Sequence, residues 1–109
     1  MSMEIKEYVG KFVKVGDTYG MIDAVYGSRL GFIWSDKDSW TGQLVDADKV
    51  EVLAKMEDIA KARLSAKNYL LRERAALKAR IARKLQTDNQ ATLQELLDFV
   101  LSWISRLGE

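Results

Sequence analysis

The chain has 109 residues, of which 48% are hydrophobic and 30% charged, and its formal net charge is +1. This composition is typical of one compact domain, or of a small module with an appendage. The chain contains no cysteine and no histidine. Disulfides and thiol nucleophiles are therefore excluded, as are the usual general base and the commonest metal ligand. We expect no cofactor.

The first residues, MSMEIKEYVGK, carry acids and no apolar segment of the kind found in secretory signals. No other stretch has the length and apolarity that a bilayer requires. We therefore expect a cytoplasmic protein that does not contact membranes. Its charge is unevenly distributed: residues 1–52 carry −3, residues 53–86 carry +7 and residues 87–109 carry −3. Such blocks can pair within the chain, pair between chains, or attract an external polyanion.

The first half of the sequence predicts short strands separated by turns. Alternating or apolar runs bounded by glycine, aspartate and serine are found at 11–15, 21–26, 30–34, 39–45 and 50–53. A turn is expected at 16–20 and a single helical turn at 46–49. Five short strands in about 50 residues favour a small curled antiparallel barrel, because a flat sheet of this size leaves its edges exposed.

The run GKFVKVGDTYGMIDAV (10–25), the hairpin after it and the DADK turn before VEVL resemble the SH3-like small barrels, including KOW-type modules. The resemblance lies in the rhythm of the strands and covers less than half of the chain. Such barrels host many functions. The resemblance implies that ligands contact loop aromatics, which here are Tyr19, Tyr26, Trp34 and Trp40.

The second half of the sequence predicts a helical hairpin. Residues 53–86 contain no glycine or proline and are rich in alanine, leucine, lysine, arginine and glutamate, which are good helix formers. A break near 65–68 is an open alternative to one long helix. A second helix is expected at about 92–107, with Thr92 and Glu95 as a capping box and Gly108 just past its end. The predicted class is α+β, with a barrel at 1–53 and a helical hairpin at 54–109.

The last helix is strongly amphipathic. Its apolar side must be covered, either by the rest of the protein or by a second copy in a symmetric dimer. The residues that we expect to mediate protein interaction on this side are Leu93, Leu96, Leu97, Val100, Leu101, Trp103 and Ile104.

The long helix is the most basic part of the chain. A helix with this charge can follow the phosphates of a nucleic acid while barrel aromatics stack on bases. The candidate nucleic-acid-binding residues are Lys61, Arg63, Lys67, Arg72, Arg74, Lys78, Arg80, Arg83 and Lys84. The near-neutral total charge argues against this interpretation.

The stretch WSDKDSW (34–40) places two carboxylates between two tryptophans. Asp36 and Asp38 could face a metal from one side of a strand, but a calcium loop requires further oxygen ligands that are missing here. Aspartate and serine are also favoured in turns, so a solvated hairpin tip is the preferred interpretation. Trp34 and Trp40 either pair across the hairpin, or one packs in the core while the other is exposed.

No serine has a histidine to activate it, and no glycine-rich loop matches a phosphate-binding motif. We therefore expect a non-enzymatic interaction, adaptor or regulatory protein that self-associates or docks on a partner protein through its C-terminal helices. The alternative is a nucleic-acid-binding protein that uses the basic helix at 55–84.

Overall fold

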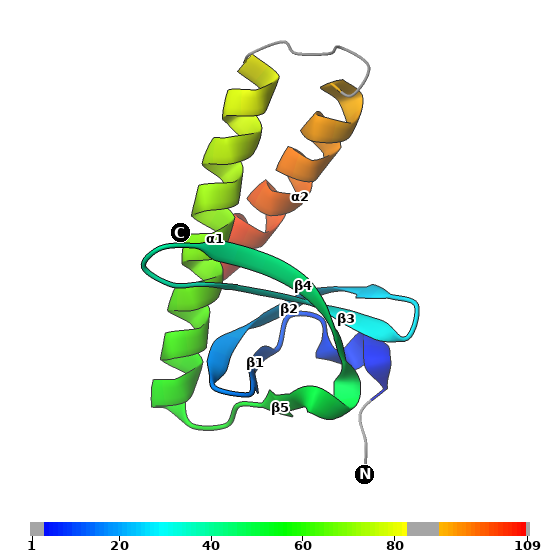
Figure 1. Ribbon diagram of the computed structural model, residues 1–109, viewed down its shortest axis with the longest axis vertical. Helices are drawn as coiled ribbons and strands as arrows, with labels where there is room; N and C mark the ends of the chain where they lie inside the picture. Colours follow the sequence, from blue (N-terminus) through cyan, green and yellow to red (C-terminus); the bar gives the residue numbers. More distant parts are fainter. Residues whose placement is uncertain (1–3, 83–89, 109) are drawn as a thin grey trace. The chain divides into compact units, whose positions relative to one another are not determined.

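The computed structural model describes residues 4–82 and 90–108, and it confirms the α+β class (Figure 1). Five strands precede two helices. The strands are β1 (Phe12–Val15), β2 (Thr18–Tyr26), β3 (Arg29–Ser35), β4 (Trp40–Asp46) and β5 (Val50–Val52). The α-helices are α1 (Met56–Ala82) and α2 (Gln90–Leu107), and two 3-10 turns are η1 (Ile5–Tyr8) and η2 (Ala47–Lys49).

The chain forms two compact units, of which the first ends at Tyr69 and the second begins at Leu70. The division therefore lies inside α1, whereas the sequence placed it after residue 53. The first turns of α1 therefore belong to the same unit as the strands.

The strands form one open antiparallel sheet in the order β4-β3-β2-β1-β5. Strands β1 to β4 follow one another as hairpins, and β5 returns to pair with β1, with Val13 opposite Val52. The predicted turn at 16–20 is shorter than expected, because β2 already begins at Thr18. Gly16 has a φ of 61°, a left-handed conformation that glycine adopts without steric cost. The predicted helical turn before β5 is present as η2.

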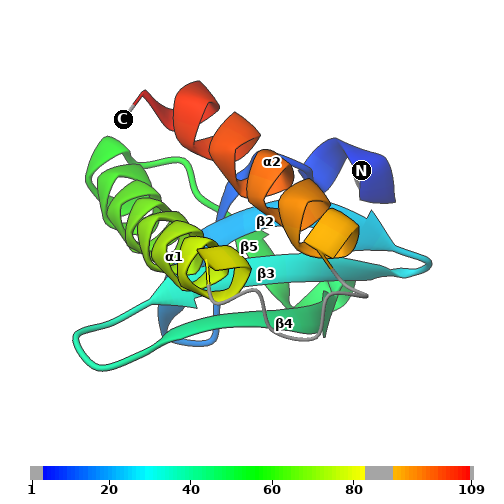
Figure 2. The ribbon, with the colours of Figure 1, turned by 90° about the horizontal axis from the view of Figure 1, so that it is seen from above.

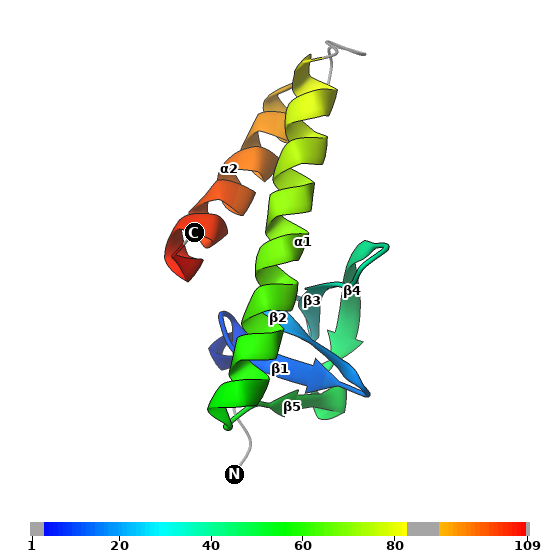
Figure 3. The same cartoon turned by 90° about the vertical axis from the view of Figure 1, so that its left-hand side faces the viewer.

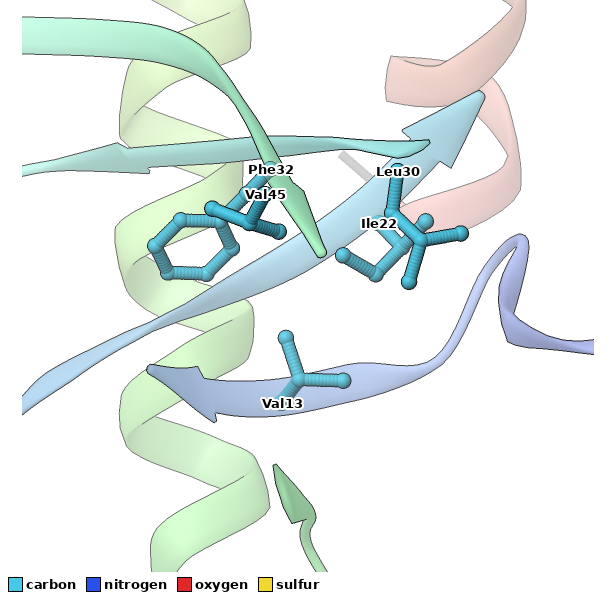
Figure 4. Packing of buried hydrophobic residues seen from close by; sticks show 5 residues of the cluster. All are labelled: Val13, Ile22, Leu30, Phe32 and Val45. Carbon is cyan, nitrogen blue, oxygen red and sulfur yellow. The ribbon is translucent and has the colours of Figure 1, made fainter. Parts of the chain in front are cut away.

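One face of the sheet carries the hydrophobic core. Val13, Ile22, Leu30, Phe32 and Val45 come from four strands and are buried together (Figure 4). Partly buried side chains pack around them, namely Ile5, Tyr8, Val15, Val25, Trp34, Ala47 and Val50.

The opposite face of the sheet is also covered. Strand register aligns Phe12, Met21, Ile33 and Gly42 in one row across β1 to β4. Met21 and Ile33 are fully buried, although neither belongs to the core cluster. The Tyr69 side chain of α1 reaches this row, since a Cβ at position 42 would lie 3.0 Å from the Tyr69 hydroxyl oxygen.

Two serines connect the end of β3 to α1. The Ser35 backbone N–H donates to Ser65 Oγ at 2.9 Å, and Ser35 Oγ donates to the Ser65 carbonyl at 2.8 Å. Ser65 Oγ also donates to the Ser35 carbonyl at 3.3 Å. On the same side of the helix, Ala62 and Ala66 are fully buried, because their small side chains let the helix approach the sheet closely. The first turns of α1 accordingly lie alongside the strands (Figures 2 and 3).

Helix α1 is continuous through 65–68, so the alternative of a break there is wrong. Its buried positions include Ala62, Ala66, Leu70 and Leu77, whereas Met56 is 86% exposed. The buried side of this helix therefore combines two small residues with two leucines.

In the second unit, α2 runs antiparallel to the adjoining part of α1 (Figure 1). It begins at Gln90, so Thr92 lies inside the first turn and is not the expected cap. It ends as predicted at Leu107, where Gly108 has a φ of 73° and its N–H donates to the Ser105 carbonyl.

A substitution at Gly20 tests how closely β2 packs against β3 in the first unit. A Cβ at position 20 would meet the backbone oxygen of Ile33 and the ring of Phe32. We predict that Gly20→Ala lowers the free energy of unfolding by more than ~3 kcal/mol. Gly16→Ala meets no atom and should cost about 1 kcal/mol for its backbone conformation alone. Urea unfolding measures the loss of unfolding free energy in both variants. Equal losses in Gly20→Ala and Gly16→Ala would contradict the close packing around Gly20.

Candidate functional site

The tip between β3 and β4 is a hydrogen-bonded turn. Asp36 Oδ1 accepts from the backbone N–H groups of Asp38 and Ser39, both at 2.9 Å, and from Ser39 Oγ at 3.2 Å. The Asp36 carboxylate thus stabilises its own turn. Among the described residues, no three metal-ligating side chains come together.

The two tryptophans of this hairpin do not pair. Trp34 lies opposite Thr41, and Trp40 lies opposite Ser35, so the two indoles project from opposite faces. Trp34 packs against the core and its Nε1 donates to Gln43 Oε1 at 3.3 Å. Trp40 is 41% exposed. The two tryptophans are thus in different environments, with Trp34 partly buried against the core and Trp40 more exposed.

The predicted interaction residues on α2 divide into two groups. Leu93, Leu97, Val100, Trp103 and Ile104 are buried, whereas Leu96 and Leu101 are 47% and 36% exposed. The buried group stabilises the protein itself, and only the exposed group is available to a partner.

Phe99, which the sequence analysis did not select, extends the exposed group. It is 40% exposed, and its ring meets Trp103 edge to face with 6.5 Å between centroids. The guanidinium of Arg106 lies 4.5 Å from the centroid of the Trp103 ring. Leu96 and Phe99 follow the i, i+3 spacing of one helix face, next to the buried Trp103. We call these two residues the α2 ridge.

The candidate basic residues lie along α1 in two environments. Lys61, Arg63, Lys78 and Arg80 are exposed, and Lys67, Arg72 and Arg74 are half-buried. Arg83 and Lys84 lie outside the described residues. Lys61 comes close to a predicted aromatic: its Nζ is 5.5 Å from the centroid of the Tyr19 ring, and Lys14 Nζ is 5.6 Å from the same centroid.

A further site, absent from the sequence analysis, is formed on the α1 side of the sheet. The pairing of β2 with β3 shifts register between Ile22 and Ala24, so Asp23 is an extra residue without a strand partner. Such a bulge re-aims a side chain. The Asp23 carboxylate occupies the space left by Gly31, where a Cβ would lie 2.7 Å from Asp23 Oδ1.

Around this carboxylate lies a hollow of about 370 Å³. Two glycines on adjacent strands, Gly31 and Gly42, form part of its wall, and Leu44 borders it. A Cβ at position 31 would lie 2.9 Å from Cε2 of Tyr26, which places the Tyr26 ring beside Asp23. Tyr69, on α1, lines the hollow from the side of Gly42. We call this site the Asp23 hollow.

Burial raises the pKa of Asp23 from 3.8 to about 6, although a hydrogen bond with its own backbone acts in the opposite direction. Partial burial and the neighbouring Asp23 carboxylate together raise the pKa of Tyr26. Within residues 4–82 and 90–108, no lysine or arginine forms an ion pair with Asp23. The site therefore holds a desolvated carboxylate without a cation.

Of the four predicted ligand aromatics, only Tyr26 lines the hollow. Sequence patterns gave two signals that were not used: an aspartate inside the apolar run MIDAVY, and single glycines inside two predicted strands. An isolated glycine in a strand indicates a bulge or close approach. Tyr69 carried no comparable signal, because its place depends on how α1 packs.

Neither described helix contains an apolar stretch of the length needed to cross a membrane. No protein-family model, curated protein or solved structure matches the chain significantly.

The raised pKa of Asp23 predicts a specific pH dependence of stability. The folded protein holds the Asp23 proton more tightly than the unfolded chain. The stabilisation that comes from this tighter proton binding is complete below about pH 4 and is lost as the pH rises through about 6. The free energy of unfolding of Asp23→Asn, relative to that of the wild-type protein, should therefore rise by ~2 kcal/mol between about pH 4 and pH 7.5, as measured by urea unfolding.

The matched control for this experiment is Asp48→Asn, which removes an exposed carboxylate from the same unit. Its free-energy difference from wild type should stay nearly constant over this pH range. A constant difference for Asp23→Asn as well would show that the Asp23 carboxylate is not desolvated.

Proposed function

We propose that the protein is a cytoplasmic, non-enzymatic interaction protein that self-associates through its C-terminal helices. The α2 ridge carries this proposal, because Leu96 and Phe99 keep 47% and 40% of their surface exposed beside a buried seam. Exposed aromatic and aliphatic side chains next to a packed helix pair are typical of an assembly face.

The occupant that we propose for this face is a second copy of the same chain. Two helical hairpins that pack side by side form a four-helix bundle, the commonest way to cover such a ridge. Charge complementarity supports this choice. Glu95 and Asp98 are exposed on α2, and Lys78 and Arg80 are exposed on α1, so α2 of one protomer can lie against α1 of the other with opposite charges facing.

For the N-terminal unit we propose a half-open SH3-like barrel that serves as a scaffold. Its support is the order β4-β3-β2-β1-β5, in which the last strand returns beside the first, and the single turn η2 before β5. The core cluster on one face of the sheet is consistent with a sheet that curls around it.

Nucleic-acid binding is the second candidate. One observation favours it: Lys14 and Lys61 flank the same aromatic ring, that of Tyr19, as in surfaces that combine phosphate contacts with base stacking. Such binding should weaken steeply as salt rises. Co-elution with single-stranded DNA only at low salt, together with a monomeric protein, would favour this candidate over self-association.

Self-association is tested by light scattering on a sizing column at about 0.05 and about 0.5 M salt. We predict a dimer at both, because apolar burial is weakly screened. The variant Leu96→Glu/Phe99→Glu should be monomeric, since two carboxylates would be buried in the interface. Both positions are exposed, so far-UV circular dichroism should show unchanged helix content.

The control variant is Ala91→Glu/Ser102→Glu, which adds the same charge at two exposed positions of α2 outside the ridge. It should remain dimeric. A monomeric wild-type protein at high concentration, or a ridge variant as dimeric as the control, would refute self-association through α2.

A further inference from the structure

The Asp23 hollow contains a chemical arrangement that self-association does not use. A single carboxylate lies half-buried among apolar neighbours on a bulge, and Tyr26 and Tyr69 line the same hollow. Burying a carboxylate without a cation costs stability, and replacing it with an uncharged residue would remove that cost. A charged group that is buried at the expense of stability is typical of a binding site.

The hollow stays open because two of the residues that line it, Gly31 and Gly42, have no side chain. Side chains at positions 31 and 42 would collide with Asp23 and Tyr26 on one side and press on Tyr69 on the other. Both are glycine, so the space between the carboxylate and the Tyr69 hydroxyl stays open. At about 370 Å³ the hollow is at the small end of ligand sites.

The chemistry of the lining selects among ligand classes. An anion is disfavoured, because Asp23 is the only residue with a formal charge among the described residues that line the hollow. A divalent metal requires several oxygen ligands, and the described residues bring no such group together. A wholly apolar ligand would leave the carboxylate buried and unpaired. A compact organic cation satisfies the carboxylate and also gains from the face of a tyrosine ring.

We propose that the Asp23 hollow binds a primary alkylammonium group, with Asp23 as its counter-ion, Tyr26 as an aromatic wall and the alkyl chain lying against Leu44. Tyr26 and Leu44 are 55% and 50% exposed, so the ligand can enter from solvent. The ammonium group has two sources, a free amine or a lysine side chain of another protein, and the chemistry of recognition is the same for both.

Binding should depend on pH through the Asp23 carboxylate. The other titratable groups that face it are Tyr26 on β2 and Tyr69 on α1, and no ionisable side chain of β3 or β4 lines the hollow. The pKa of Tyr26 is raised above its usual value by partial burial and by Asp23, so this tyrosine stays protonated below pH 8. With an Asp23 pKa of about 6, the apparent affinity should fall about tenfold at about pH 5 relative to pH 7.5, because only the ionised form binds.

The test is an NMR titration of the full chain that follows the backbone amides of Gly31 and Gly42. The probes are n-butylammonium and the peptide acetyl-Gly-Lys-Gly-amide, and norleucine replaces lysine in a neutral control peptide. We expect saturable shifts with n-butylammonium and none with the norleucine peptide. Equal shifts with the lysine peptide would assign the hollow to protein lysines, and shifts with n-butylammonium alone would assign it to free amines.

Two variants separate binding from folding. Asp23→Asn keeps the shape of the side chain and should lose at least tenfold in affinity while its spectrum stays folded, whereas Asp48→Asn should bind like wild type. Unchanged affinity in Asp23→Asn, no pH dependence, or equal binding of the norleucine peptide would overturn the proposal. Because the α2 ridge lies in the other unit, the ridge variant should still bind the amine.

Discussion

The first unit depends on the contact between Ser35 and Ser65. Three hydrogen bonds, two of them to backbone groups of Ser35, attach α1 to the end of β3. A net value of about 1 kcal/mol for each makes this one of the larger polar contributions in a domain of this size. Tyr69 lies one turn after Ser65, so the contact that attaches the helix also sets the position of the tyrosine at Gly42. The covered outer face of the sheet and the Asp23 hollow both follow from it.

The two sites have different physical origins. The Asp23 hollow is made by irregularities of the sheet, namely a bulge and two glycines, and it retains a charge that burial disfavours. The α2 ridge is made by a regular helix with more apolar surface than one partner helix covers. The first site is suited to one small cation, and the second to an extended apolar surface.

Much of the fold was predictable because it depends on local patterns. The alternation of apolar and polar residues predicted the strands near their observed positions, and the glycine at position 108 predicted where α2 ends. Ser65 shows where such patterns fail. The sequence left open a break near 65–68, yet the helix is continuous there and the Ser65 hydroxyl bonds to a strand thirty residues earlier. Ala62 and Ala66 were overlooked for a related reason, since the close approach of helix to sheet makes small residues the buried ones. The Asp23 hollow depends on a register shift that no local pattern specifies.

The most direct test of this account is the through-space NMR contact between the ring of Tyr69 and the Hα protons of Gly42. It should be strong in the wild-type protein and in Ser105→Ala, which changes an exposed serine of α2. In Ser35→Ala/Ser65→Ala, which removes all three hydrogen bonds between the two residues, it should be greatly weakened, because the helix is no longer held at Ser35. An undiminished contact in this double variant would contradict the claim that this pair of serines positions Tyr69 at the hollow.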